Sequence, residues 1–392
     1  MPIESEIKKS AGQLAGTLAR IRREIHACPE PGFKETRTCR KITGILKQIG
    51  LDRVIAPVAG TGVIGLLAGH SPDGKTAALR ADIDALPILE ENNVPYKSRN
   101  RGMMHACGHD AHIAMCLGAA MILKRLRGRF RGKVKFIFQP AEERLDGAPA
   151  MIRAGVLENP KVDAIFALHV MPEIEFGQVS CAPGPAWAAA DRFLIEITGR
   201  GGHGAMHFKC IDPVLVASEV YSGLQSIERN LCGTDPRVIS VCCIHGGSAF
   251  NIIPDRVVME GTVRTFEKSV QATIIRRMRE ITAGICAAHG AKWKITYQKG
   301  VPATVNDGRM AALLRKAACG LGMSLAPDKP SMGGEDFSFF LQKVPGAIAR
   351  IGVRTGKKMP DLHNSRFDAG DRILPLGAAL LAKCALDAME AS

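Results

Sequence analysis

The chain has 392 residues, of which 46% are hydrophobic and 23% charged, and it carries a net charge of +14 at pH 7. This composition is typical of a globular protein, and the length favours two domains over one. The sequence contains no apolar stretch long enough to span a membrane and no Cys-x-x-Cys pair among its twelve cysteines, and we expect no secretory signal. We therefore expect a cytoplasmic protein with mostly free thiols.

The positive charge raises the question of nucleic-acid binding. The densest basic run, residues 124–133, is expected at a helix-to-strand junction, and the other basic residues are dispersed along the chain. Three tyrosines and two tryptophans are too few for a base-stacking platform. We expect no nucleic acid and no membrane as partner, although a basic surface could attract anionic substrates.

The first half of the chain alternates between helix and strand patterns. Helix-spaced apolar positions predict a first helix over residues 7–26, which Pro29 ends. The next predicted elements are a helix over 35–49, strands over 54–58, 62–68 and 76–81, a helix over 111–126, a strand over 134–138, a helix over 148–154 and a strand over 164–168. This alternation predicts an α/β domain with a largely parallel sheet.

The pattern changes after about residue 181. The predicted elements are a strand over 186–198, a helix over 212–227, strands over 238–244 and 257–265, a helix over 270–288 and a strand over 291–297. This β-α-β-β-α-β order is that of ferredoxin-like domains. Further elements over 307–319, 347–351 and 369–388 should complete the first domain. We predict a catalytic domain formed by residues 1–182 and 297–392, and an inserted α+β domain over 183–296.

One stretch is unusually rich in metal-ligating side chains. Residues 103–112 contain three histidines, one cysteine and one aspartate where a loop becomes a helix. Such a density of thiol, imidazole and carboxylate groups is uncommon unless the segment binds a metal. The alternative is that these residues only cap the start of the helix.

Other polar clusters follow predicted strands, where ligands of α/β sheets gather. They are residues 80–87, residues 139–143, His169, and residues 361–364 in a loop before the last helix. Taken singly, each cluster is weak evidence, because an acidic pair after a strand is usually a solvated turn and a lone histidine at a strand end is usually structural. Taken together, they and the stretch 103–112 supply enough ligands for two metal ions that share a bridge, namely Cys107, His109, Glu143, His169 and His363.

Six motifs, in order over nearly the whole chain, carry a family resemblance. They are RADIDALP (80–87), MHACGHD (104–110), FQPAEE (138–143), GRGGH (199–203), NIIPD (251–255) and MGGEDF (332–337). They resemble the M20 metallopeptidase superfamily, and more narrowly its amidohydrolase branch of hippurate hydrolases, N-acyl-amino-acid amidohydrolases and auxin-conjugate hydrolases. The resemblance implies an α/β di-metal hydrolase domain with an inserted ferredoxin-like dimerisation (lid) domain. It also implies hydrolysis of N-acyl amino acids to a carboxylic acid and a free amino acid.

The resemblance also implies roles for single residues. It makes the five residues named above the ligands of two divalent transition-metal ions, with Cys107 where relatives have a bridging aspartate. Because a thiolate is a soft ligand, we expect Zn²⁺, Mn²⁺, Co²⁺ or Ni²⁺ rather than Mg²⁺ or Ca²⁺. Glu142 is implied as the general acid/base and Asp82 as an orienting carboxylate. If Glu142 and Glu143 end one extended strand, their side chains point apart, which leaves Glu142 free to transfer protons.

Three implied residues lie on the inserted domain. His203 would reach a neighbouring active site and polarise the scissile carbonyl group, while Asn251 and Arg264 would contact the substrate. The implied assembly is a homodimer or homotetramer.

Three further polar residues lie beside the implied ligands. We expect His105 to be a loop residue outside the direct ligand set and His112 to lie on a polar helix face. We expect Arg144 to point to solvent rather than to substrate.

Three alternatives stay open at this point. One is a deacetylase of a biosynthetic intermediate such as N-acetyl-diaminopimelate. Another is a binding protein that keeps the fold without catalysis, although no implied ligand or base is missing. The third is a nucleic-acid binder, which only the net charge suggests.

Overall fold

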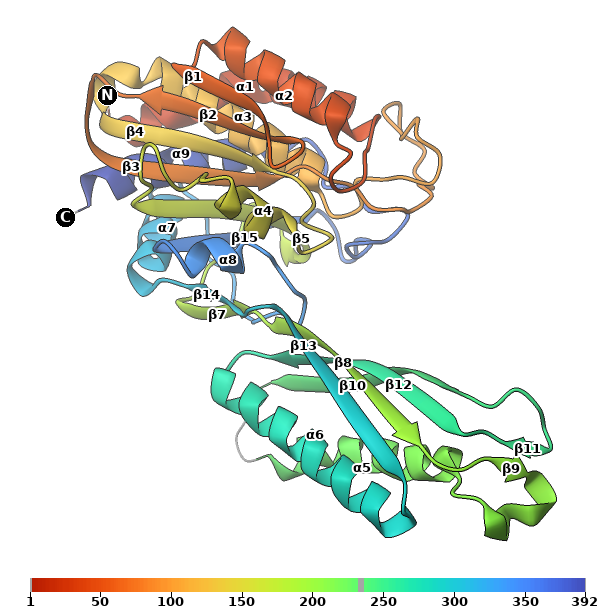
Figure 1. The fold of residues 1–392 in the computed structure, drawn as a ribbon. Coiled ribbons are helices and arrows are strands. Elements are labelled where there is room, and N and C mark those ends of the chain that lie inside the picture. Colours follow the sequence, from red (N-terminus) through yellow and green to blue (C-terminus); the bar gives the residue numbers. More distant parts are fainter. Residues whose placement is uncertain (1, 232–235, 392) are drawn as a thin grey trace. The chain divides into compact units, whose positions relative to one another are not determined.

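The computed structural model describes residues 2–231 and 236–391 and divides into two compact units (Figure 1). The first unit contains the described residues up to Ala186, Val305–Lys329 and the chain from Asp336 onward, and the second contains Trp187–Thr304 and Pro330–Glu335. The second unit begins and ends a few residues later than the predicted insertion 183–296, partly because its last strand runs on to Val301. In the described part of the chain, no helix is long and apolar enough to cross a membrane.

A seven-stranded sheet forms the centre of the first unit. Its strands are β1 (Arg53–Val58), β2 (Gly62–Ala68), β3 (Ser71–Asp82), β4 (Arg131–Gln139), β5 (Ala164–Glu175), β6 (Val179–Ser180) and β15 (Gly346–Arg354). Their order is β1-β2-β4-β3-β5-β15-β6, with β4, β3, β5 and β15 parallel and the remaining strands antiparallel to their neighbours. The expected parallel centre is therefore present, with antiparallel strands at both edges.

Helices cover both faces of this sheet (Figure 1). They are α1 (Ile3–His26), α2 (Thr36–Ile49), α3 (His109–Arg125), α4 (Gly147–Arg153), α7 (Gly308–Gly320), α8 (Ser338–Leu341) and α9 (Leu374–Glu390), with a short 3₁₀ helix, η1 (Arg127–Arg129). On one face α3 and α9 pack on the central strands, and α1 packs on both of these helices. On the other face, α4 contacts β4 and α8 contacts β15.

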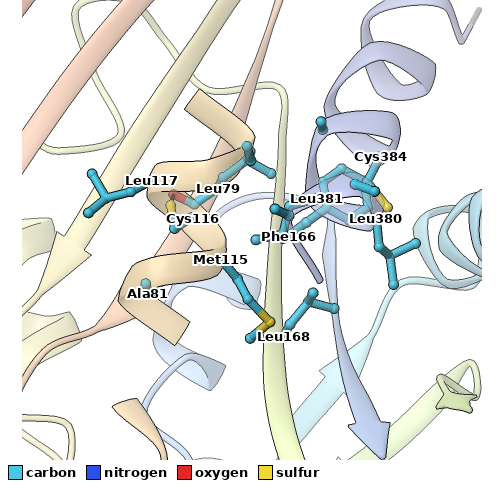
Figure 2. Packing of buried hydrophobic residues seen from close by; sticks show 14 of the residues in the cluster. Leu79, Ala81, Met115, Cys116, Leu117, Phe166, Leu168, Leu380, Leu381 and Cys384 are labelled. Carbon is cyan, nitrogen blue, oxygen red and sulfur yellow. Dashed lines mark hydrogen bonds between the residues drawn. The ribbon is translucent and has the colours of Figure 1, made fainter. Parts of the chain in front are cut away.

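The α3–α9 contact explains why the start of α3 is held rigidly. Figure 2 shows Met115 and Cys116 of α3 and Leu381 of α9 packed over residues of β3 and β5. The two helices approach closely because glycines lie where they meet: a Cβ added at Gly118 of α3 would lie 2.7 Å from Ala378 Cβ, and one added at Gly377 of α9 would lie 1.9 Å from Met115 Sδ. Interiors this dense leave little room for a helix to shift. The donor-rich residues that begin α3 are therefore anchored to the core.

The second unit has the β-α-β-β-α-β order expected from the sequence. Its main elements are β8 (Ala189–Thr198), α5 (Pro213–Asn230), β10 (Arg237–Gly246), β12 (Arg256–Thr265), α6 (Lys268–His289) and β13 (Lys292–Val301). The sheet order is β10-β12-β8-β13, with each neighbouring pair antiparallel. Alternate residues of β12 are buried against α5 and α6, which form this unit's own core. Asp212 caps α5 by accepting a hydrogen bond from the Val214 N–H (2.8 Å).

Short elements complete the chain. They are β7 (Gly184–Trp187), β9 (Gly202–His203), the 3₁₀ helix η2 (Gly204–Lys209), β11 (Ile252–Ile253) and β14 (Thr304–Asn306). The strand expected over residues 186–198 is thus two strands, β7 and β8, which pair with different partners.

Candidate metal centre and active site

Five side chains from distant parts of the first unit meet at the carboxyl ends of its parallel strands. Their possible ligand atoms form two sets. The atoms of Cys107, His109 and His169 lie within 4.8 Å of one another, and so do those of Cys107, Glu143 and His363. Cys107 belongs to both sets, and its Sγ lies 3.5 Å from His169 Nε2. A side chain common to two neighbouring sets is what a bridged pair of cations requires.

Two of the histidines are oriented by their second ring nitrogen. His109 Nδ1 lies 3.0 Å from the Asp84 carbonyl oxygen, and His169 Nδ1 lies 2.9 Å from the Val170 carbonyl oxygen. Each Nδ1–H therefore donates to the backbone, so that in the neutral ring each Nε2 is an acceptor directed to the cluster. This arrangement is the usual one for metal-ligating histidines.

His169 reaches the cluster from inside a strand. The prediction that it ends its strand is wrong, because β5 continues to Glu175. β5 nevertheless pairs with β3 only as far as Ala167, whereas its pairing with β15 continues past His169. His169 thus lies beyond the point where β3 stops pairing, and its Nε2 reaches Cys107 Sγ.

Glu142 and Glu143 lie in a turn, not at an extended strand end. Ala141 has φ +52° and the Leu145 N–H donates to the Glu142 carbonyl oxygen (2.7 Å). Both carboxylates consequently point into the cluster: Glu142 Oε2 and Glu143 Oε1 each lie 3.9 Å from His109 Nε2. The expectation that the two side chains point apart is wrong, and proximity alone does not distinguish the base from the ligand.

Asp84 holds this turn in place. Its Oδ1 accepts a hydrogen bond from the Glu142 N–H (3.0 Å) and its Oδ2 accepts one from the Glu143 N–H (3.1 Å). Asp84 is buried, and its own carbonyl oxygen orients His109. Asp84 thus connects three residues of the cluster. It is a functional candidate that we did not single out from the sequence, although it lies in the same motif as Asp82.

Asp82 lies beside the cluster, with its Oδ1 3.9 Å from His109 Nε2, and also contacts residues around it. One oxygen lies 2.6 Å from His112 Nδ1 and the other accepts a hydrogen bond from Arg80 Nη1 at 2.6 Å. His112 Nε2 accepts the Val170 N–H (3.0 Å), so both ring nitrogens are engaged. The prediction of a polar helix face for His112 is wrong, because its side chain is buried. Asp82 orients His112, which packs against His169 with ring centroids 4.8 Å apart.

The pKa values reflect burial and crowded charges. Burial raises the pKa of the Cys107 thiol well above its ordinary value, and the Glu143 and Glu142 carboxylates raise it further. Burial lowers the pKa of His109, but Asp82 and Asp84 outweigh burial and raise it to about 10. For Glu143, burial raises the pKa, but His363 and His109 outweigh it and lower the pKa. A cation among these groups would favour the thiolate and neutral imidazole, which are the ligating forms.

The chemistry of the cluster fits divalent transition metals. Among the residues that the structure describes, His109 Nε2 and Glu143 Oε1 are buried and have no hydrogen-bond partner, although unpaired buried polar atoms are rare in native proteins. One thiol, three imidazoles and a carboxylate form a donor set suited to Zn²⁺, Mn²⁺, Co²⁺ or Ni²⁺ and poorly suited to Mg²⁺ or Ca²⁺. The residues present therefore fit a pair of such ions.

Two neighbours of the cluster contribute less directly. His105 is buried in the loop before Cys107, and burial lowers its pKa to about 3. Arg144 is exposed, with its guanidinium 5.7 Å from the centre of the Phe33 ring. His105 belongs to neither set of ligand atoms and Arg144 is exposed to solvent, in line with the expectations for both.

The residues predicted on the inserted domain all lie in the second unit. His203 pairs with Ile252, and the Gly204 N–H donates to the Asn251 carbonyl oxygen (2.8 Å), so His203 and Asn251 are neighbours. His203 is exposed, and its Nδ1 accepts a hydrogen bond from the Ala205 N–H (3.2 Å), which leaves Nε2 to contact other groups. His203 and Asn251 lie close to the residues that lead into β12, whereas Arg264 lies near the far end of this strand. From Arg256 to Arg264, β12 extends about 26 Å, at roughly 3.3 Å per residue.

Comparison with known proteins identifies the class. A model of peptidase family M20/M25/M40 matches residues 78–387. N-acetylcysteine deacetylase of Bacillus subtilis (strain 168) is 38% identical, over 95% of this chain and 97% of that protein. IAA-amino acid hydrolase ILR1-like 4 of Arabidopsis thaliana is 38% identical, over 93% of this chain and 84% of that protein. The crystal structure of Bacillus subtilis YXEP, described as a dinuclear metal binding peptidase, has a TM-score of 0.87 at 36% identity and covers 97% of this chain and 100% of that chain.

The fold and these relatives define the chain as a hydrolase acting on amide bonds. It belongs to peptidase family M20/M25/M40.

Proposed function

We propose that the protein is a two-metal amidohydrolase that cleaves N-acyl amino acids into a carboxylic acid and a free amino acid. The observation that carries this proposal is the pair of ligand sets that share Cys107. In the proposed site, one ion would be held by Cys107, His109 and His169, and the other by Cys107, Glu143 and His363. When bound, such ions lower the pKa of a coordinated water to about 7 and polarise the amide oxygen.

Glu142 is the residue proposed to move protons. Its side chain is buried, and Oε2 lies 3.9 Å from His109 Nε2, which puts the carboxylate beside the ligands. It would take a proton from the attacking water and deliver that proton to the leaving nitrogen. Asp84 supports this role because it fixes the backbone of Glu142 and Glu143 through two hydrogen bonds. The base therefore keeps its orientation through both transfers.

His203 is proposed to polarise the scissile carbonyl group of a neighbouring subunit's substrate. Its exposed Nε2 can donate to an oxygen that gains negative charge. The spacing within the second unit supports sharing between subunits. His203 lies near the start of β12 and Arg264 near its end, so one unit cannot bring both side chains to one small N-acyl amino acid. If both residues touch one substrate, they come from different subunits, which makes the functional form at least a dimer.

The compartment is proposed to be the cytoplasm. All cysteines that the structure describes are free, including buried Cys39, Cys116 and Cys384. Free thiols in this number suit a reducing environment, because an oxidising compartment favours disulfide formation.

The substrate class can be tested with a hydrolysis panel. The protein would be loaded separately with Zn²⁺, Mn²⁺, Co²⁺ or Ni²⁺ and offered N-acetyl amino acids, hippurate, indole-3-acetyl amino acids and N-acetyl-diaminopimelate. We expect release of a free amino acid from at least one N-acyl amino acid and loss of activity with a chelator. Cleavage of N-acetyl-diaminopimelate alone would instead favour the biosynthetic deacetylase.

The base can be tested with one substitution and a matched control. Glu142→Gln should lower kcat by at least about 10²-fold without loss of bound metal, because an amide cannot carry the proton. Glu280→Gln makes the same chemical change on the exposed face of α6 and should leave kcat unchanged. Full turnover by Glu142→Gln would contradict the assigned role.

Sharing of the site can be tested by mixing inactive variants. Random exchange between His203→Ala and Glu142→Ala subunits would give mixed dimers, each with one intact site, and about a quarter of wild-type activity. Confirmed subunit exchange without any recovery would argue against a contribution from the neighbouring subunit.

A further inference from the structure

A buried charged network lies beside the ligand cluster and has no role in the mechanism above. At its centre is Arg22 of α1, whose side chain is fully buried. Arg22 Nε donates to Asp110 Oδ2 (2.8 Å), Nη1 donates to Asp371 Oδ1 (3.1 Å), and Nη2 donates to Asp368 Oδ1. His26, one turn further along α1, lies 2.8 Å from the same Asp110 oxygen. One guanidinium thus joins three carboxylates.

Two of these connections lead directly to proposed metal ligands. Asp110 follows His109 in the first turn of α3, so a bond to Asp110 fixes the helix end that carries His109. Asp368 and Asp371 lie in the segment that follows His363 and leads into α9. The start of this segment contacts the loop that carries Cys107, because the His363 N–H donates to the Ala106 carbonyl oxygen (2.8 Å).

Anchoring α1 does not require this network. The apolar side of α1 already packs against the core through Leu14, Leu18, Ile21 and Ile25. Buried ion pairs are poor stabilisers compared with apolar residues of similar size, because desolvation offsets their attraction. What the planar guanidinium adds is geometry: its donors point in fixed directions and hold several carboxylates at a defined spacing.

We propose that Arg22 is a positioning residue for the metal centre, holding the His109 and His363 segments at the spacing that two bound ions require. The inference rests on the proposed function, since it takes His109 and His363 as ligands. Loss of Arg22 would leave the ligands present but free to move apart. The direct consequence is weaker metal binding, while proton transfer by Glu142 should persist wherever the ions are bound.

Three variants test this role, all measured at a temperature where circular dichroism shows a folded chain. Arg22→Gln removes the bridge, and Arg22→Lys keeps the charge but lacks the planar fork. Lys135→Met is the matched control: Lys135 is a buried cation whose Nζ donates to the carbonyl oxygens of Val156, Glu158 and Pro160, each at 2.8 Å. None of its partners lies on a ligand-bearing segment.

The readout is Zn²⁺ or Mn²⁺ affinity, measured by competition with a chromophoric chelator. Arg22→Gln should weaken binding by about tenfold or more, the usual effect of removing a partner that orients ligands. Arg22→Lys should be intermediate, and Lys135→Met should bind like wild type. Saturating metal should restore the kcat of Arg22→Gln, because Glu142 and all proposed ligands are unchanged in this variant.

Each other outcome has a distinct meaning. Unchanged affinity in Arg22→Gln, or equal weakening in Lys135→Met, would overturn the positioning role while leaving the metal centre intact. A wild-type protein that binds neither ion would instead overturn the proposed function. If Arg22→Gln does not fold, Asp371→Ala removes the Nη1 partner of Arg22 on the segment that follows His363, and wild-type affinity in that variant would count against the proposal.

Discussion

Removing the Asp84 carboxylate should destabilise the first unit. Asp84 is buried and accepts hydrogen bonds from the Glu142 and Glu143 N–H groups at 3.0 and 3.1 Å. A hydrogen bond to a charged group contributes about 1.5–3 kcal/mol, so Asp84→Ala should lower the free energy of unfolding by about 3–6 kcal/mol. Asp84→Asn keeps one acceptor oxygen and should lose about half as much. Relief of repulsion between neighbouring carboxylates will offset part of this loss.

The two units allow a measurement with an internal control. Both tryptophans of the chain, Trp187 and Trp293, belong to the second unit, so tryptophan fluorescence reports on that unit. Urea unfolding followed by far-ultraviolet circular dichroism should show an earlier transition in Asp84→Ala, while the fluorescence transition stays near that of wild type. A dichroism transition within about 0.5 kcal/mol of wild type would refute the role we give Asp84.

Three further predictions follow from the same geometry. Gly108→Ala should lower the free energy of unfolding by about 1–3 kcal/mol in urea titrations, because Gly108 has φ +84° and an added Cβ would lie 2.3 Å from Val170 Cγ2; a neutral result would mean that this loop is freely adaptable. Burial lowers the pKa of His26, but Asp110 and Glu90 outweigh burial and raise it from 6.5 to about 9. The stability from His26, about 3 kcal/mol, should be fully present below pH 6.5 and disappear as the pH rises through 9, so the difference between wild type and His26→Gln should shrink over that range; a constant difference would exclude this linkage. Metal at a hundred times its dissociation constant should raise the unfolding free energy by about 2.7 kcal/mol per site, and a melting temperature that a chelator does not change would contradict specific binding.

Hydrophobic periodicity predicted most elements of both units, but not every strand end. The apolar run that predicts a strand over 164–168 ends at Leu168, whereas β5 continues to Glu175. The continuation depends on pairing with β15, where Gly352 lies opposite Met171. A partner so far away in the chain leaves no trace in the local pattern.

The candidate ligands were predictable because short motifs carry them. The residues that orient these ligands were harder to predict. His112 seemed to belong to a polar helix face, but α3 is buried nearly all round, and such a helix has no polar stripe. Asp84 shares a motif with Asp82, and its importance emerges only from the turn that it caps. Arg22 is harder still to predict, since its carboxylate partners lie 88, 346 and 349 residues away.

The most direct test of the proposed metal centre is anomalous diffraction from crystals grown with Zn²⁺ or Mn²⁺. We predict two anomalous peaks per subunit, one among Cys107, His109 and His169 and one among Cys107, Glu143 and His363, with the Cys107 sulfur between them. Peaks confined to other residues, or none at full metal loading, would contradict a two-metal site.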